Sequence, residues 1–144
     1  MNVIRMLSRS LFCAVLLSTG LKAPSRADAN IQAQGLIGSV WTGEGYDNGL
    51  TVTYVFRFNE DSLALESTCH NDVISSTLNS RLGVSYLKNG ATAKLKSGLQ
   101  SSIPAGIQTC EVYFPPALEF HLENGQIFLV YKGVRTPTSM KRHI

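Results

Sequence analysis

The feature that most constrains this chain is an alternation of apolar and polar residues with a period of two. In the segment "TVTYVFRF" the apolar face consists of Val52, Tyr54, Phe56 and Phe58. The same alternation occurs in "ATAKLK" at 91–96 and in "ALEFHLE" at 117–123. Such a period is typical of β-strands that are buried on one side and solvated on the other. No stretch with a helical period is long enough to compete, so the sequence predicts an all-β fold.

Turn signals divide the alternating runs into short strands. The pair Asn-Gly, which tolerates the positive φ angles of a tight hairpin turn, occurs at 48–49, 89–90 and 124–125. Strands are therefore expected near 38–45, 51–58, 62–69, 76–88, 91–97, 107–114, 118–123 and 126–133. The segment "LQSSIPAG" at 99–106 is expected to be a short helical turn or a loop.

About eight antiparallel strands in hairpin order have edges that must be protected. Closing the sheet into an up-and-down barrel removes these edges. A two-layer β-sandwich is the alternative, but most of its topologies need long crossover connections. Nearly every connection expected here is short, and we therefore predict an eight-stranded antiparallel up-and-down barrel.

The first 29 residues have the three parts of a secretory signal peptide. Arg5 and Arg9 form a basic start, 11–17 is apolar, and the small residues of "ADA" at 27–29 suit a cleavage site. The apolar run is far shorter than the roughly 20 residues that cross a bilayer. We therefore expect a cleaved leader, one mature domain at 30–144, no stable membrane anchor, and a periplasmic or secreted location.

Charge balance argues against a nucleic-acid partner. The whole chain has 13 basic and 10 acidic residues, and the leader contains four of the former and one of the latter, which leaves nine of each. The mature chain therefore has no net formal charge. Proteins that bind nucleic acid normally have a clear basic excess.

Two cysteines, Cys69 and Cys110, remain once the leader with Cys13 is removed. An even number of thiols in an oxidising compartment indicates a disulfide. By the chain-entropy relation, closing this loop contributes about 4 kcal/mol to the free energy of unfolding. The alternative is a pair of unpaired buried cysteines, whereas the absence of a CxxC motif argues against metal binding or redox catalysis.

Three segments carry a resemblance to a known family. The sequences "LIGSVWTGE" at 36–44, "YVFRFNEDSLALES" at 54–67 and "GQIFLVYKG" at 125–133 resemble the bacterial lipocalin-like branch of the calycin barrels. Gly38 and Trp41 are separated by one residue more than in that family. The resemblance implies that Trp41 closes one end of the barrel beneath a basic side chain, which would be Arg135, Lys141 or Arg142. Independently of any family, an indole beside a cation gains about 0.5–2 kcal/mol.

These features favour a non-enzymatic binding module that holds a small hydrophobic ligand inside the barrel. The candidate ligand-binding residues are Trp41, Tyr54, Phe56, Tyr86 and Phe120. Trp41 also fits a purely structural role. Eight-stranded barrels either hold one small ligand or are filled by their own side chains, and composition does not choose between these outcomes.

The second hypothesis is an interaction protein, specifically a periplasmic protease inhibitor. Small disulfide-containing barrels that inhibit bacterial metalloproteases are similar in general layout, and their N-terminal segment enters the protease cleft. The resemblance implies that "NIQAQGL" at 30–36 would have this role, together with the loops.

No catalytic constellation, cofactor site or metal site is predicted. His70, His121 and His143 do not form a pair with metal-ligand spacing. Glu44 and Glu66 are the carboxylates nearest to a predicted barrel mouth, but the alternation turns Glu66 toward water. Nothing in the spacing favours the third hypothesis, an isomerase that uses carboxylates or a tyrosine in the cavity, and we expect no enzymatic activity.

Overall fold

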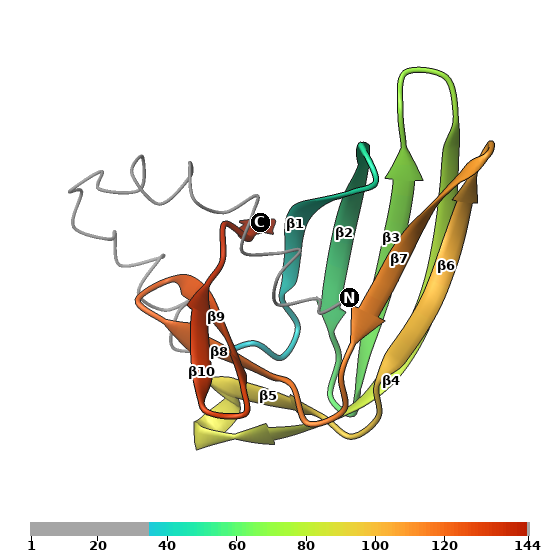
Figure 1. Cartoon of the computed structure of the whole chain (residues 1–144). Coiled ribbons are helices and arrows are strands. Elements are labelled where there is room, and N and C mark those ends of the chain that lie inside the picture. Colours follow the sequence, from blue (N-terminus) through green and yellow to red (C-terminus); the bar gives the residue numbers. More distant parts are fainter. Residues whose placement is uncertain (1–34, 144) are drawn as a thin grey trace.

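The computed structural model describes residues 35–143, whose regular elements are strands apart from one 3₁₀ turn (Figure 1). These elements are β1 (Val40–Asp47), β2 (Leu50–Phe58), β3 (Ser62–His70), β4 (Ser75–Leu87), the 3₁₀ turn η1 (Lys88–Gly90), β5 (Thr92–Leu95), β6 (Leu99–Ala105), β7 (Gln108–Phe114), β8 (Glu119–Glu123), β9 (Gln126–Tyr131), β10 (Val134–Pro137) and β11 (Lys141–His143). The prediction of an all-β fold is confirmed. The predicted signal peptide lies outside the described residues.

Nine of the strands form one strongly curled antiparallel sheet, a half-barrel, with the order β10-β9-β8-β5-β4-β3-β2-β1-β11 (Figure 1). The other two, β6 and β7, form a separate hairpin that packs against β3 and β4. The expected hairpin order is therefore interrupted once, because β5 pairs with β8 and not with β6. Strand β4 is long enough to change partner at Gly83, from β3 to β5.

The C-terminal segment links the two edges of the curled sheet. β10 pairs with β9, whereas β11 pairs with β1 so that Arg142 lies opposite Trp41. Only residues 138–140 separate these two strands. Four chain steps span at most about 14 Å, and the two edges are therefore held close together.

The expectation for 99–106 is wrong, because most of this segment is strand β6. Its register places Ile103 opposite Cys110, and both side chains are buried. Pro104 is exposed on the opposite face and lies opposite Thr109 of β7. The two C-terminal strands β10 and β11 also go beyond the predicted set.

The alternation correctly identifies the buried faces. Val52, Tyr54, Phe56 and Phe58 are all buried, and so are Leu63, Leu65 and Cys69 in β3 and Cys110, Val112 and Phe114 in β7. All three Asn-Gly pairs have positive φ at both residues, as tight turns require. The core is therefore built from the residues that the period of two selects.

Candidate functional site

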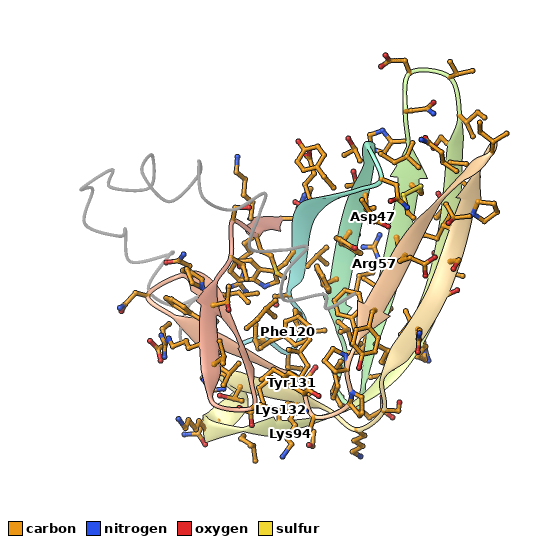
Figure 2. All side chains as sticks on the ribbon, in the orientation of Figure 1. Asp47, Arg57, Lys94, Phe120, Tyr131 and Lys132 are labelled. Atoms are coloured by element: carbon orange, nitrogen blue, oxygen red, sulfur yellow. A yellow bond between two sulfur atoms is a disulfide. The ribbon has the colours of Figure 1, made fainter. Side chains whose placement is uncertain are left out.

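Most of the aromatic residues predicted to bind a ligand lie inside the curled sheet. Phe120, labelled in Figure 2, is one of them. Trp41, Tyr54, Phe56 and Phe120 are buried, whereas Tyr86 is half-buried and its hydroxyl donates to the backbone oxygen of Asn59. The interior rings pack on one another. The ring centroids of Phe56 and Phe120 are 5.6 Å apart, and those of Tyr54 and Phe56 are 5.9 Å apart.

Two further phenylalanines complete this aromatic cluster. Phe114 lies edge-on to Tyr54 and to Phe56, at centroid distances of 5.6 and 5.9 Å. Phe58 lies edge-on to Phe120 at 5.4 Å. These are the separations of aromatic rings in direct contact. The predicted ligand-binding rings are thus brought together by packing, and a hydrophobic ligand between them stays a prediction.

Trp41 makes one hydrogen bond and one cation–π contact. Its indole Nε1 donates to Ser39 Oγ at 2.9 Å. The guanidinium of Arg142 lies over the ring, with Cζ 5.7 Å from the centroid. Of the three basic residues considered, Arg142 is therefore the one that lies beside Trp41. Arg135 instead lies over Phe128 at 3.9 Å.

Two buried hydroxyls lack a hydrogen-bond partner among the described residues, Tyr54 Oη and Ser67 Oγ. They belong to neighbouring strands, because Tyr54 is opposite Ser67 in the pairing of β2 with β3. Burial, and then the negative charge of Asp47, raises the pKa of Tyr54 far above its usual range. Burial therefore favours the neutral form of this phenol.

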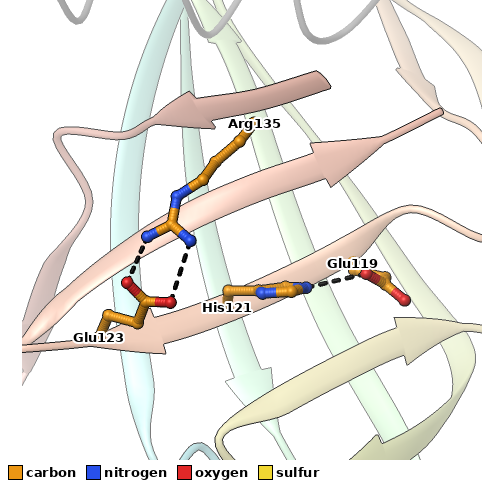
Figure 3. A network of polar contacts seen from close by, with 4 residues as sticks. All are labelled: Glu119, His121, Glu123 and Arg135. Carbon is orange, nitrogen blue, oxygen red and sulfur yellow. Dashed lines mark hydrogen bonds and ion pairs between the residues drawn. The ribbon is translucent and has the colours of Figure 1, made fainter. Parts of the chain in front are cut away.

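The histidines make separate polar contacts on the outer faces. His121 Nε2 is 2.8 Å from Glu119 Oε2, beside the ion pair of Arg135 with Glu123 (Figure 3). His70 contacts the Thr53 hydroxyl at 3.2 Å, and His143 contacts that of Thr42 at 3.2 Å. Within residues 35–143 no three His, Cys, Asp or Glu side chains are placed to hold a metal ion.

Three turns gather at one end of the molecule, which we call the tip (Figure 1). We define the tip surface as the β1–β2 turn (Asn48 and Gly49), the β3–β4 turn (71–74) and the β6–β7 turn (Gly106 and Ile107). The Asn48 side-chain amide donates to the Thr109 backbone oxygen at 3.1 Å. The β1–β2 turn is thereby fixed to β7, the strand that follows the β6–β7 turn.

The predicted disulfide is present and lies directly below the tip. Cys69 in β3 and Cys110 in β7 are bonded, with their Cα atoms 6.0 Å apart. Cys69 lies two residues before the β3–β4 turn, and Cys110 lies three residues after Ile107. Asp47 adds a second link, because its carboxylate accepts a hydrogen bond from the Glu111 backbone N–H at 2.7 Å. The disulfide and this hydrogen bond therefore hold together the strands that lead to the tip.

The β3–β4 turn is fixed by its own hydrogen bonds. The side-chain oxygen of Asn71 accepts from the backbone N–H groups of Val73 and Ile74, both at 2.8 Å. The backbone N–H of Asn71 donates to the Ile74 oxygen at 2.9 Å. An Asn side chain that binds backbone N–H groups two and three residues ahead stabilises a single turn conformation.

The β6–β7 turn packs against the β3–β4 turn at Gly106. Gly106 has a φ of +69°, and a Cβ atom built on it would come within 2.9 Å of Ile74 Cδ1. Any side chain at this position would strain the backbone and push against Ile74. Glycine thus lets the two turns touch.

The most exposed large apolar side chains of the described chain are both on the tip. Val73 is 88% exposed and Ile107 is fully exposed. The other exposed ones, among them Ile37, Leu87 and Val134, keep about half of their surface covered. The tip surface thus presents two uncovered apolar side chains on turns that are held by hydrogen bonds and lie close to the disulfide.

Sequence reasoning named the loops only in general terms and did not single out Val73 or Ile107. The two residues are far apart in the chain, but Val73 lies four residues after Cys69 and Ile107 lies three residues before Cys110. The disulfide prediction, extended by a few residues beyond each cysteine, is the signal that brings the two turns together.

Comparison of the chain with protein-family models, with curated proteins and with solved structures gives no match. No helix among residues 35–143 is long and apolar enough to cross a membrane. Two open hollows occur on the outer faces of the sheet. One lies beside Glu44 and Lys141, and the other lies beside Arg57 and Glu66.

Proposed function

We propose that this protein is an exported, non-enzymatic binding module with a calycin-like barrel, which recognises another protein through its tip surface. The observation that carries the proposal is the high exposure of Val73 and Ile107 on turns whose strands are joined by a disulfide. Preorganised loops lose little conformational entropy on binding, and exposed apolar side chains supply the buried area that association needs. The disulfide also supports an oxidising compartment.

The packing of the interior favours this function over a ligand held inside the barrel. Five interior rings contact one another at centroid distances between 5.4 and 5.9 Å. A small hydrophobic ligand would have to separate these rings and give up their contacts. Recognition at the surface requires no such rearrangement. Protease inhibition is one form that this recognition can take, although the segment predicted to enter a protease cleft lies mostly outside the described residues.

A site-specific photo-cross-linker tests the proposal. We place it at position 107, in the full chain produced in its own cell envelope, and identify any protein that becomes attached. The control carries the same group at Val134, an exposed apolar residue on β10. We expect one protein to be captured from position 107 and not from position 134. Capture of the same proteins from both positions, or of none, contradicts the proposal.

A further inference from the structure

The charged residues of this chain are divided unevenly between its two ends. Around the tip, residues 43–53, 67–79 and 100–113 contain four acidic residues, Glu44, Asp47, Asp72 and Glu111, and no lysine or arginine. Residues 35–143 have nine basic and nine acidic residues in all, so the rest of this described part has nine basic and five acidic ones. These three segments therefore have a formal charge of −4 (0 minus 4), with Asp72 in the tip surface itself and Asp47 buried, and the remainder has +4 (9 minus 5).

In Figure 2 Asp47 lies toward the end where the three turns meet, Arg57 lies below it in this view, and Lys94 and Lys132 lie at the opposite end. Asp72 lies in the β3–β4 turn, next to Val73, and is exposed. Glu111 lies below the β6–β7 turn and accepts from the Ser102 hydroxyl at 2.8 and 2.9 Å. Lys141, which shares an outer hollow with Glu44 and Tyr46, is the cation beside this acidic region.

From this arrangement we infer that the partner is a basic protein whose cleft takes in Val73 and Ile107 and whose cationic rim faces Asp72 and Glu111. This rests on the proposed function, because it specifies the partner of the same tip surface. Complementary charge around an apolar contact accelerates association and suppresses wrong partners. Two apolar side chains alone would be a nonspecific contact, and the surrounding acids make the surface selective.

The same charges argue against a lipid surface as the occupant. Biological membranes have a negative surface potential or none, and an acidic tip is repelled from them. Side chains that enter a bilayer are usually surrounded by lysine and arginine. The described ranges around this tip contain neither.

The test uses the purified protein captured from position 107 and measures its Kd for the full mature chain. Asp72→Lys reverses one charge next to Val73, and Glu60→Lys makes the same change in the β2–β3 turn at the opposite end. We expect Asp72→Lys to weaken binding at least about tenfold and Glu60→Lys to change it little. Raising the salt from about 0.05 to 0.5 M should weaken wild-type binding by about tenfold or more, because the Debye length shortens.

Each other outcome has a definite meaning. If a protein is captured at position 107 but its Kd changes with neither salt nor Asp72→Lys, the basic partner is overturned while docking through the tip stands. If nothing is captured, the proposed function itself fails. Binding of the wild type to vesicles of phosphatidylglycerol, lost in Ile107→Ser, assigns the tip to a membrane and overturns the inference.

A second copy of the chain is the remaining occupant, because its opposite end is positive. Sedimentation of the purified mature chain at rising concentration decides this point, and we expect a monomer. Self-association that Asp72→Lys abolishes would show that the tip binds another copy, which also overturns the inference. Asp72→Asn, which removes the charge without adding bulk, repeats each measurement if the lysine variant does not fold.

Discussion

Tyr54 has a fully buried hydroxyl without a hydrogen-bond partner among the described residues. A buried polar group in this state costs about 1–3 kcal/mol. Tyr54→Phe removes the hydroxyl and keeps the ring contacts with Phe56 and Phe114, so we expect it to raise the free energy of unfolding by about 1 kcal/mol. Urea denaturation of the two proteins measures the change.

Tyr86 supplies the matched control, because its hydroxyl donates to the Asn59 backbone oxygen. Tyr86→Phe loses this bond and is expected to lower the free energy of unfolding by about 0.5–1 kcal/mol. A Tyr54→Phe variant that is less stable than the wild type would show that its hydroxyl has a bound partner in solution, such as an internal water.

Tyr86 also gives a prediction about alkaline pH. Burial, and then the charge of Asp61, raises the pKa of Tyr86 to about 12. The unfolded chain, in which the pKa is near 10, loses this proton first. The contribution of Tyr86 to stability is therefore complete below pH 10 and is lost as the pH rises from about 10 to 12.

The difference between the tyrosinate absorbance of the wild type and that of Tyr86→Phe, followed as the pH is raised, isolates this group. We expect one midpoint near pH 12. A midpoint near pH 10 while the chain is still folded would contradict the burial of this phenol.

Among the elements, β3 and β7 belong to different sheets and are cross-linked by the disulfide. Replacing Cys69 and Cys110 together by alanine releases a loop with a sequence separation of 41 residues. The chain-entropy relation gives a loss of about 4 kcal/mol in the free energy of unfolding. Chemical denaturation of the oxidised wild type and of the double variant measures this loss. A loss below about 1 kcal/mol would contradict a stabilising role for the disulfide.

Strand β11 makes a second prediction, because it brings Arg142 over Trp41. Arg142→Gln removes the cation–π contact and should lower the free energy of unfolding by about 0.5–1 kcal/mol. It should also raise the quenching of Trp41 fluorescence by acrylamide. Lys141→Gln, at the exposed neighbouring position, serves as the control and should change neither. Equal effects of the two variants would contradict a specific role for Arg142.

The elements were predictable where one face is buried and the period of two is strong. Strand β2, with Val52, Tyr54 and Phe56 inward, is the clearest case. Strand β6 was missed because serines and Pro104 interrupt its apolar positions, although Ile103 and Ala105 are buried. The pairing of β5 with β8 was not predictable, since alternation fixes which face of a strand is buried and not which strand lies beside it.

At the scale of the whole molecule, the disulfide was predictable but the tip was not. Cys69 and Cys110 are the only two cysteines outside the predicted leader, which is a count that the sequence provides. Whether Val73 and Ile107 are covered depends on which turns meet, and that follows from the curl of the sheet and the packing of the β6–β7 hairpin. The uneven distribution of acidic and basic residues likewise follows only from the fold, which brings segments that are distant in the sequence to the same end of the molecule.

The central proposal is that the interior of the half-barrel is filled by its own side chains and that recognition occurs at the tip, next to the disulfide. Native mass spectrometry of the protein purified from its own compartment tests this most directly, because it reports small molecules, protein partners and the oxidation state together. We predict the mass of an oxidised chain without a bound small molecule, alone or in complex with one other protein. A hydrophobic small molecule bound at one copy per chain, or two free thiols, would contradict the account.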